Sequence, residues 1–110
     1  MPYYVKTEKF NLKALNMPSS KRNKFIAEHK SWVQSMQSSG IKVFSGYLID
    51  RDRKPGGGGL LIIDCNSYNQ AESRINKDPM IINKLVDWKL HEYIPLGDNS
   101  IFSFIEDMLP

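Results

Sequence analysis

The chain has 110 residues, of which 41% are apolar and 25% are charged. These proportions are typical of one globular domain and exclude a wholly disordered chain. The 15 Lys and Arg residues outnumber the 12 Asp and Glu residues, which gives a net charge of +3. A domain that binds nucleic-acid backbone usually carries more positive charge than this. Cys65 is the only cysteine, so no internal disulfide can form, as fits a reducing compartment.

The sequence indicates neither export nor membrane insertion. Its first ten residues contain no apolar run behind a positive patch, which argues against a secretory signal. The longest apolar run, residues 60–63, is far shorter than the roughly 20 residues that cross a bilayer. We therefore expect a cytoplasmic domain that does not enter a membrane.

The charge is unevenly distributed along the chain. Residues 1–60 carry a balance of +7, whereas residues 61–110 carry −4. This asymmetry is compatible with a basic pocket for an acidic small molecule. A solvated surface that happens to be uneven is the simpler explanation.

The first third of the chain predicts a strand followed by a long helix. Residues 3–9 are rich in Tyr and Val and predict the strand. We interpret residues 11–18 as a connection. Ser19 or Ser20 is suited to cap a helix, which we expect to run to about Ser39. Its apolar face contains side chains spaced by four, three and four residues, namely Phe25, His29, Trp32 and Met36.

The remainder predicts three strands, a helix and two short helical segments. Gly40 is placed to end the first helix, and strands are expected over residues 41–49, 60–65 and 86–94. Ser67 begins the second helix, with Gln70 completing a capping-box pattern. Asp78-Pro79 interrupts that helix. The two short helical segments are expected over residues 79–84 and 100–109.

The resulting order, βαββαβ, predicts a ferredoxin-like α+β sandwich with a four-stranded antiparallel sheet and both helices on one face. The nearly continuous apolar run at residues 60–63 indicates a strand that is covered on both faces. A second copy of the chain is the simplest cover for the face without helices, so we expect a homodimer. The division we expect is a domain over residues 1–95 and an extension over residues 96–110.

RNA-recognition motifs share this element order, but they carry aromatic residues in the third strand. That strand here is apolar and free of aromatic residues. We therefore expect no nucleic-acid partner.

Several features together resemble the YCII-related (YciI-like) domain family over residues 3–94. They are Tyr3-Tyr4-Val5 in the first strand, Arg22 and His29 on the first helix, Ser45-Gly46 in the second strand, and Asp78-Pro79 before the last strand. The resemblance implies a fold of the dimeric α+β-barrel superfamily, in which two sheets pack face to face. It also implies a pocket between helices and sheet that contains a His and an Asp. The family often shows Gly-Pro where this chain has Gly46-Tyr47, so the rim of the pocket differs.

His29 and Asp78 are the candidate catalytic residues. An imidazole exchanges protons near neutral pH, and a carboxylate on one ring nitrogen fixes the tautomer and stabilises the charged form. Each residue has a structural alternative. His29 could be a buried histidine of the core, and Asp78 before a proline is a usual helix N-cap. The 49 positions between them say nothing of their distance, so only the resemblance brings them together.

Arg22, Ser45 and Gly46 are the candidate substrate-binding residues. Arg22 precedes His29 by about two helical turns, so it could anchor an anion or simply be solvated. No metal site is expected, because His29 and His91 have no Cys, Asp or Glu neighbours at ligand spacing. Ser45 lacks the Gly-x-Ser-x-Gly setting of a hydrolase nucleophile. Gly56–Gly59 leads into a strand rather than a helix, which excludes a P-loop.

These residues lead to two hypotheses of function. The first is a small enzyme without a cofactor, an isomerase, lyase or hydrolase-like catalyst, that uses His29 and Asp78 on a small polar or aromatic metabolite. The second is a dimeric module that binds a metabolite or accompanies another protein without catalysis. Either function implies a small ligand, anionic or aromatic.

Overall fold

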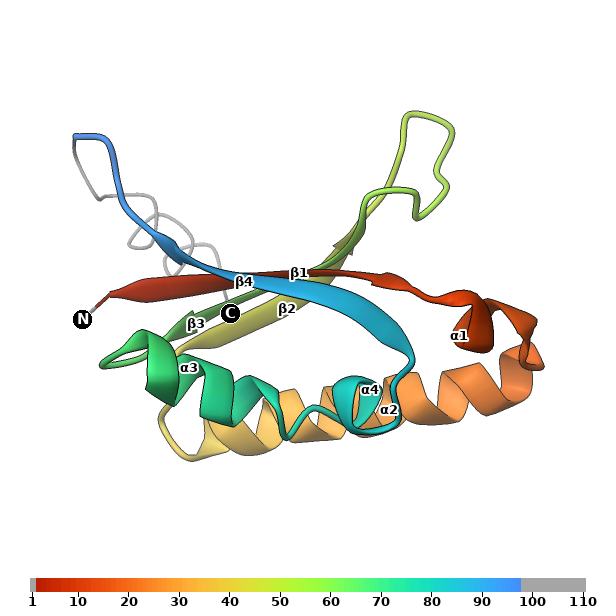
Figure 1. Cartoon of the computed structure of the whole chain (residues 1–110), viewed down its shortest axis with the longest axis horizontal. Helices are drawn as coiled ribbons and strands as arrows, with labels where there is room; N and C mark the ends of the chain where they lie inside the picture. Colours follow the sequence, from red (N-terminus) through yellow and green to blue (C-terminus); the bar gives the residue numbers. More distant parts are fainter. Residues whose placement is uncertain (1, 98–110) are drawn as a thin grey trace.

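The computed structural model describes residues 2–97, which fold into one antiparallel sheet with helices along one face (Figure 1). In chain order the elements are β1 (Tyr3–Phe10), α1 (Leu12–Asn16), α2 (Ser19–Ser38), β2 (Val43–Leu48), β3 (Gly58–Asp64), α3 (Tyr68–Ile75), α4 (Pro79–Ile82) and β4 (Val86–Tyr93). The helix predicted over residues 100–109 lies outside the described residues. None of the helices in residues 2–97 is both long and apolar enough to span a bilayer.

The sheet has the strand order β2-β3-β1-β4, and all three neighbouring pairs are antiparallel. This order confirms the predicted ferredoxin-like βαββαβ fold. Side chains alternate between the two faces of a sheet, so Tyr4 of β1 and its register partner Ile63 of β3 lie on the same face. Val43 of β2 is also a register partner of Ile63 and lies on this face too.

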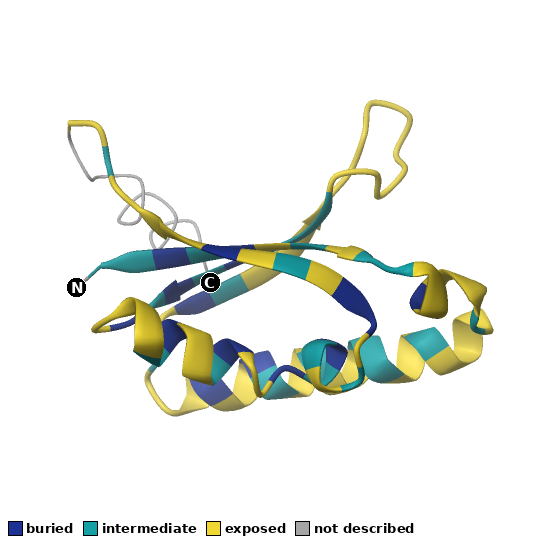
Figure 2. Cartoon of the chain, in the orientation of Figure 1, coloured by how far each residue is buried: buried dark blue, intermediate teal, exposed yellow. Residues whose placement is uncertain are grey.

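The face covered by helices carries the hydrophobic core. Buried residues lie between the sheet and the helices, whereas the outer surfaces of the helices are exposed (Figure 2). The sheet contributes Tyr4, Val43, Leu61, Ile63 and Leu90, and the helices contribute Val33, Met36, Ala71 and Ile75. The helical spacing of three and four residues therefore places the core side chains as expected.

Several predicted helix boundaries are confirmed by their capping contacts. The Ser67 hydroxyl accepts a hydrogen bond from the Gln70 backbone N–H at 3.1 Å, and Gly40 follows α2 with a φ of +86°. The Gln70 side chain accepts from the Asn66 backbone N–H instead of from Ser67, so the capping box is shifted by one residue. Asp78 caps α4 by accepting from the Met80 backbone N–H at 2.9 Å.

Two expectations about the start of α2 were wrong. The segment before it contains α1, a helix of five residues whose first turn is capped by Asn11. This helix is too short to show a hydrophobic period. The cap position of α2 is occupied by Pro18, with no side-chain hydrogen bond, and Ser19 is already helical. Pro18 is compatible with this place because its φ of −57° leads directly into helical angles.

The other face of the sheet is not covered by any element within residues 2–97 (Figure 1). Val5, Ile62 and Phe44 form one row across β1, β3 and β2 on this face, and each is only half-buried. Leu48 on the same face is 45% exposed. The alternation of β3 thus gives two wholly buried side chains, Leu61 and Ile63, and three half-buried ones on the open face, of which Leu60 and Ile62 are apolar.

A buried ion pair joins β1 to the start of α4. The Lys6 Nζ lies 2.7 Å from Asp78 Oδ2, and both side chains have 0% exposure. The same ammonium lies 3.1 Å from Oε1 of Glu8. Buried charges cost several kcal/mol each unless they are paired and hydrogen-bonded, so these three side chains must be placed together for the sheet to pack on α4.

The Asp78 carboxyl is held in its ionised form. Burial alone would raise its pKa, but the hydrogen bond from His29 and the ammonium of Lys6 outweigh burial and lower the pKa below its ordinary value of 3.8. Asp78 therefore accepts hydrogen bonds at neutral pH and donates none.

We predict that Lys6→Met lowers the free energy of unfolding by about 3–5 kcal/mol, because the change leaves Asp78 as a buried charge without its cation. Met matches the length of the lysine stem, so little volume is lost. Chemical denaturation at neutral pH measures the change. The matched control is Lys77→Met at an exposed position, which should alter stability by no more than about 0.5 kcal/mol. Equal stability of the two variants would contradict the importance of the ion pair.

Acid should selectively remove the contribution of Asp78 to stability. A carboxyl whose pKa is lowered by folding stabilises the protein fully above its unfolded-state pKa, and this stabilisation is lost as the pH falls below that value. The stability difference between the wild type and Asp78→Asn should therefore be constant near neutrality and shrink below the ordinary pKa of 3.8. Denaturation curves recorded between about pH 7 and about pH 3 test this. A difference that does not change across this range would argue against an ionised, stabilising Asp78.

Candidate functional site

A cleft of about 920 Å³ opens between α2 and the sheet. Its walls come from α2, from β1 and β2, and from the loop and first residues of β3 that follow β2. His29, Ser45 and Gly46 line this cleft. The structure therefore brings three of the five candidate site residues to one cavity, and Asp78 lies directly behind it in contact with His29.

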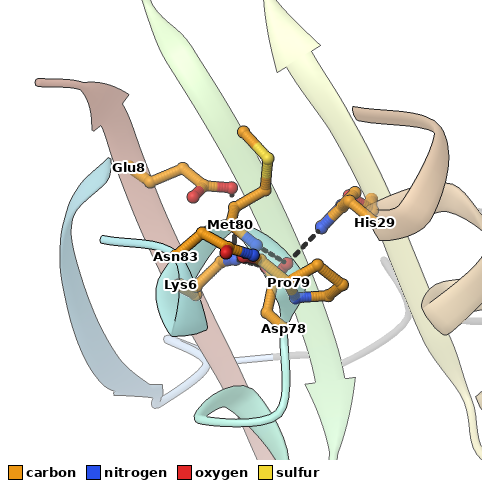
Figure 3. A network of polar contacts seen from close by, with 8 residues as sticks. Lys6, Glu8, His29, Asp78, Pro79, Met80 and Asn83 are labelled. Carbon is orange, nitrogen blue, oxygen red and sulfur yellow. Dashed lines mark hydrogen bonds and ion pairs between the residues drawn. The ribbon is translucent and has the colours of Figure 1, made fainter. Parts of the chain in front are cut away.

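His29 is held from both ring nitrogens. Its Nδ1 lies 2.9 Å from Asp78 Oδ1 and its Nε2 lies 2.8 Å from the Ser45 hydroxyl oxygen. The ring also packs against Trp32, with 5.6 Å between centroids. Only 13% of the His29 side chain is exposed. Figure 3 shows His29 reaching from α2 toward Asp78, with Lys6 on the other side of the carboxylate.

The charge of Asp78 determines the tautomer of His29. An ionised carboxylate only accepts hydrogen bonds, so Nδ1 of the imidazole carries a proton. In neutral His29 the Nε2 is then an acceptor, and the Ser45 hydroxyl donates to it. The carboxylate also stabilises the imidazolium when Nε2 takes up a proton. The arrangement can therefore accept and return a proton at the wall of the cleft.

Lys6 and Glu8 belong to the site but were missed in the sequence. A lysine in a strand is usually exposed, and the fold is needed to show that this one is not. One signal was present: positions 4, 6 and 8 share a face by the two-residue period of β1, and Tyr4 is a core residue. Glu8 lines the cleft, and its carboxylate is the second one that forms an ion pair with Lys6.

The glycine run leaves room for Glu8. A Cβ on Gly59 would lie 2.9 Å from Cγ of Glu8 and 3.0 Å from its Oε1. A Cβ on Gly58 would lie 2.2 Å from the Glu8 carbonyl oxygen, and its φ is +76°. Position 58 therefore requires glycine, and a larger residue at position 59 would have to displace the Glu8 side chain. This gives this part of the run a packing role next to the cleft.

Arg22 makes its contacts with β1, with α1 and with the residue that follows α1. One of its guanidinium nitrogens, Nη1, donates to the carbonyl oxygens of Ala14 at 3.2 Å and Met17 at 3.4 Å. The guanidinium carbon also lies 5.8 Å from the centroid of the Phe10 ring, as in a cation–π contact. The structure thus places Arg22 where it fixes α1 to α2, and it is not among the residues that line the cleft.

Other cations line the cleft instead. Lys9, Lys30 and Arg53 contribute positive charge, against the single carboxylate of Glu8. An excess of cationic side chains around a cavity favours an anionic ligand.

The remaining titratable groups are poorer candidates for catalysis or metal binding. Cys65 is wholly buried, and burial raises its pKa against the opposing effect of Arg74, so a thiolate is disfavoured. Within residues 2–97 no group of three or more His, Cys, Asp and Glu side chains is placed to hold a metal ion. His91 is exposed on β4, on the open face of the sheet opposite the cleft.

Comparison with solved structures gave relatives of the same fold at low identity. One is 5-chloro-2-hydroxyhydroquinone dehydrochlorinase from Burkholderia phenoliruptrix in complex with 2,5-dihydroxybenzoquinone, which is 16% identical with a TM-score of 0.63 over 84% of this chain and 93% of that one. Another is an Arabidopsis thaliana protein, 12% identical with a TM-score of 0.51 over 90% and 99% of the two chains. A third is a Dabb family protein with a ferredoxin-like fold from Mesorhizobium loti, 17% identical with a TM-score of 0.48 over 88% and 100%.

Comparison with curated proteins found no match. The profile of the YCII-related domain family matches residues 3–87. These residues include β1, both long helices and the whole His29–Asp78 site. The chain therefore belongs to the YCII-related domain family.

Proposed function

We propose that this protein is a small enzyme that needs no cofactor and transfers protons to and from a small anionic or aromatic metabolite. The observation that supports this most directly is the buried, ionised Asp78 on Nδ1 of a histidine that lines a cleft. In this proposal His29 is the acid–base group and Asp78 orients it. Proton transfer by an imidazole requires no metal or organic cofactor.

The proposed proton path runs through Nε2 of His29. The Ser45 hydroxyl is hydrogen-bonded to this nitrogen at 2.8 Å, and both residues line the cleft. A substrate reaches Nε2 either by displacing that hydroxyl or by exchanging its proton through it. The imidazolium that forms is stabilised by the Asp78 carboxylate, so the pair takes up a proton without leaving an isolated buried charge.

The class of substrate is proposed from the charge and size of the cleft. Three cationic side chains and one carboxylate line it, which favours a small anion. The similar dehydrochlorinase was solved with 2,5-dihydroxybenzoquinone, a small acidic ring. A ligand of this chemistry fits both the positive cleft and a reaction that moves protons at ring carbons.

We further propose that the working form is a homodimer that covers the open face of the sheet. This face carries the half-buried row Val5, Ile62 and Phe44. A shallow hollow of about 280 Å³ includes Phe44 and Ile62 of this row, and Leu48 and Leu60 also line it. A self-complementary apolar face is the type of surface that a two-fold interface uses.

We predict that the protein catalyses exchange of the carbon-bound protons of 2,5-dihydroxybenzoquinone in D₂O, as followed by proton NMR. His29→Gln should slow the exchange by about 10²–10⁴-fold, since glutamine has no titrating nitrogen. The control is Glu72→Gln, a change at an exposed position of α3 that does not line the cleft, which should leave the rate unchanged.

Two outcomes would count against catalysis. Exchange at the wild-type rate in His29→Gln would exclude the proposed base. A ligand that binds the wild type, as shown by chemical-shift changes of cleft residues, and is returned without exchange or other alteration would favour the alternative of a metabolite-binding module.

For the dimer, we predict that Ile62→Glu converts the protein to a monomer in light scattering coupled to size exclusion. A carboxylate in the centre of an apolar interface would be buried without a partner. Ile82→Glu is the control, because Ile82 is already 61% exposed on α4, and this variant should keep the wild-type mass. A monomeric wild type at tens of micromolar, or a dimeric Ile62→Glu variant, would contradict the proposed interface.

A further inference from the structure

Ser45, His29 and Asp78 form one continuous hydrogen-bonded chain. The Ser45 hydroxyl oxygen lies 2.8 Å from Nε2, and the opposite ring nitrogen lies 2.9 Å from the Asp78 carboxylate. The three groups thus occur in the order hydroxyl, imidazole, buried carboxylate. In this order a histidine activates a serine as a nucleophile, whatever the fold that supports it.

The direction of the hydrogen bonds fits this activation. The ionised Asp78 requires the proton of neutral His29 on Nδ1, so Nε2 accepts the Ser45 proton. Ser45 is exposed on β2 and lines the cleft, whereas Asp78 is wholly buried. The hydroxyl is therefore the end of the chain that a ligand can reach.

The position of Ser45 in the sheet leaves it accessible. β2 is an edge strand, and Ser45 is exposed on it. The Gly-x-Ser-x-Gly motif achieves similar access by placing serine at a sharp turn between a strand and a helix. Ser45 is accessible on its edge strand without that motif, so the sequence pattern gave no sign of an accessible serine.

We propose that Ser45 is a nucleophile for acyl transfer, so that the protein cleaves small activated esters in addition to the proton transfer proposed above. This inference rests on the same His29–Asp78 pair but not on the same reaction. The Ser45 oxygen forms a bond to the carbonyl carbon while its proton passes to Nε2 of His29. His29 then returns the proton to the leaving alkoxide as the ester C–O bond breaks, which leaves an acyl group on Ser45.

Water completes the turnover. A water molecule gives a proton to Nε2, its oxygen attacks the acyl carbon, and the Ser45 oxygen leaves and regains the proton. The oxyanion that forms in each step needs hydrogen-bond donors. Lys30 and Gln34 of α2 line the same cleft and are the side-chain donors proposed for this role.

The test is covalent labelling of the full-length protein with diisopropyl fluorophosphate. The Ser45 oxygen would displace fluoride from phosphorus, and tandem mass spectrometry would locate the adduct on Ser45 and not on the exposed Ser31 of α2. His29→Gln should slow labelling by at least about 100-fold. Hydrolysis of p-nitrophenyl acetate should be lost in Ser45→Ala and kept in Ser31→Ala.

Absence of an adduct on Ser45, or labelling at the same rate in His29→Gln, would overturn the proposal. Circular dichroism of each variant checks the fold. As a second arm, the thiol of Ser45→Cys should react with iodoacetamide near neutral pH in a manner that depends on His29, with the buried Cys65 as the unreactive reference. The two proposals fail separately: a wild type that exchanges ring protons but forms no Ser45 adduct overturns acyl transfer alone, and one that forms the adduct without exchange overturns proton transfer alone.

Discussion

The structure depends on one buried carboxylate, that of Asp78. It accepts from the Met80 backbone N–H at the start of α4, from the ammonium of Lys6 on β1, and from the imidazole of His29 on α2. Three elements that are distant in sequence therefore meet at two oxygen atoms. A charge at 0% exposure is tolerated only when it is paired and hydrogen-bonded. These elements therefore cannot pack together without also assembling the site.

This coupling fixes the positions of the side chains in the site. His29 lies within a helix of 20 residues and Ser45 within a strand, so neither side chain depends on a loop for its position. Asp78 is in turn fixed by its role as an N-cap, since its carboxylate oxygen must remain on the Met80 N–H. Its structural role and its role beside His29 are compatible because the carboxylate has enough lone pairs for all its donors.

The sequence predicted the fold well because the fold is carried by local periodicity. The apolar and β-branched composition of the strands predicted their positions. The spacing of Phe25, His29, Trp32 and Met36 predicted the long helix. The failures have physical causes. A five-residue helix such as α1 is too short to show a hydrophobic period. Lysine is a residue that usually lies on the surface, so the burial of Lys6 could not be predicted from its type. The contact of His29 with Asp78 spans 49 positions, so only the family resemblance anticipated it, and the hydrogen bonds of Arg22 to α1 carry no sequence signal.

Strand β1 shows how one short segment serves both faces of the sheet. Lys6 and Glu8 point to the helices and the cleft, while Val5 between Tyr4 and Lys6 points to the open apolar face. A shift of one residue in the pairing of β1 with β3 would exchange the two sets. It would place Val5 against Asp78 and expose Tyr4 and Lys6. The buried charge therefore also selects the register of the central strand, because no other residue of β1 between Tyr4 and Thr7 could neutralise it.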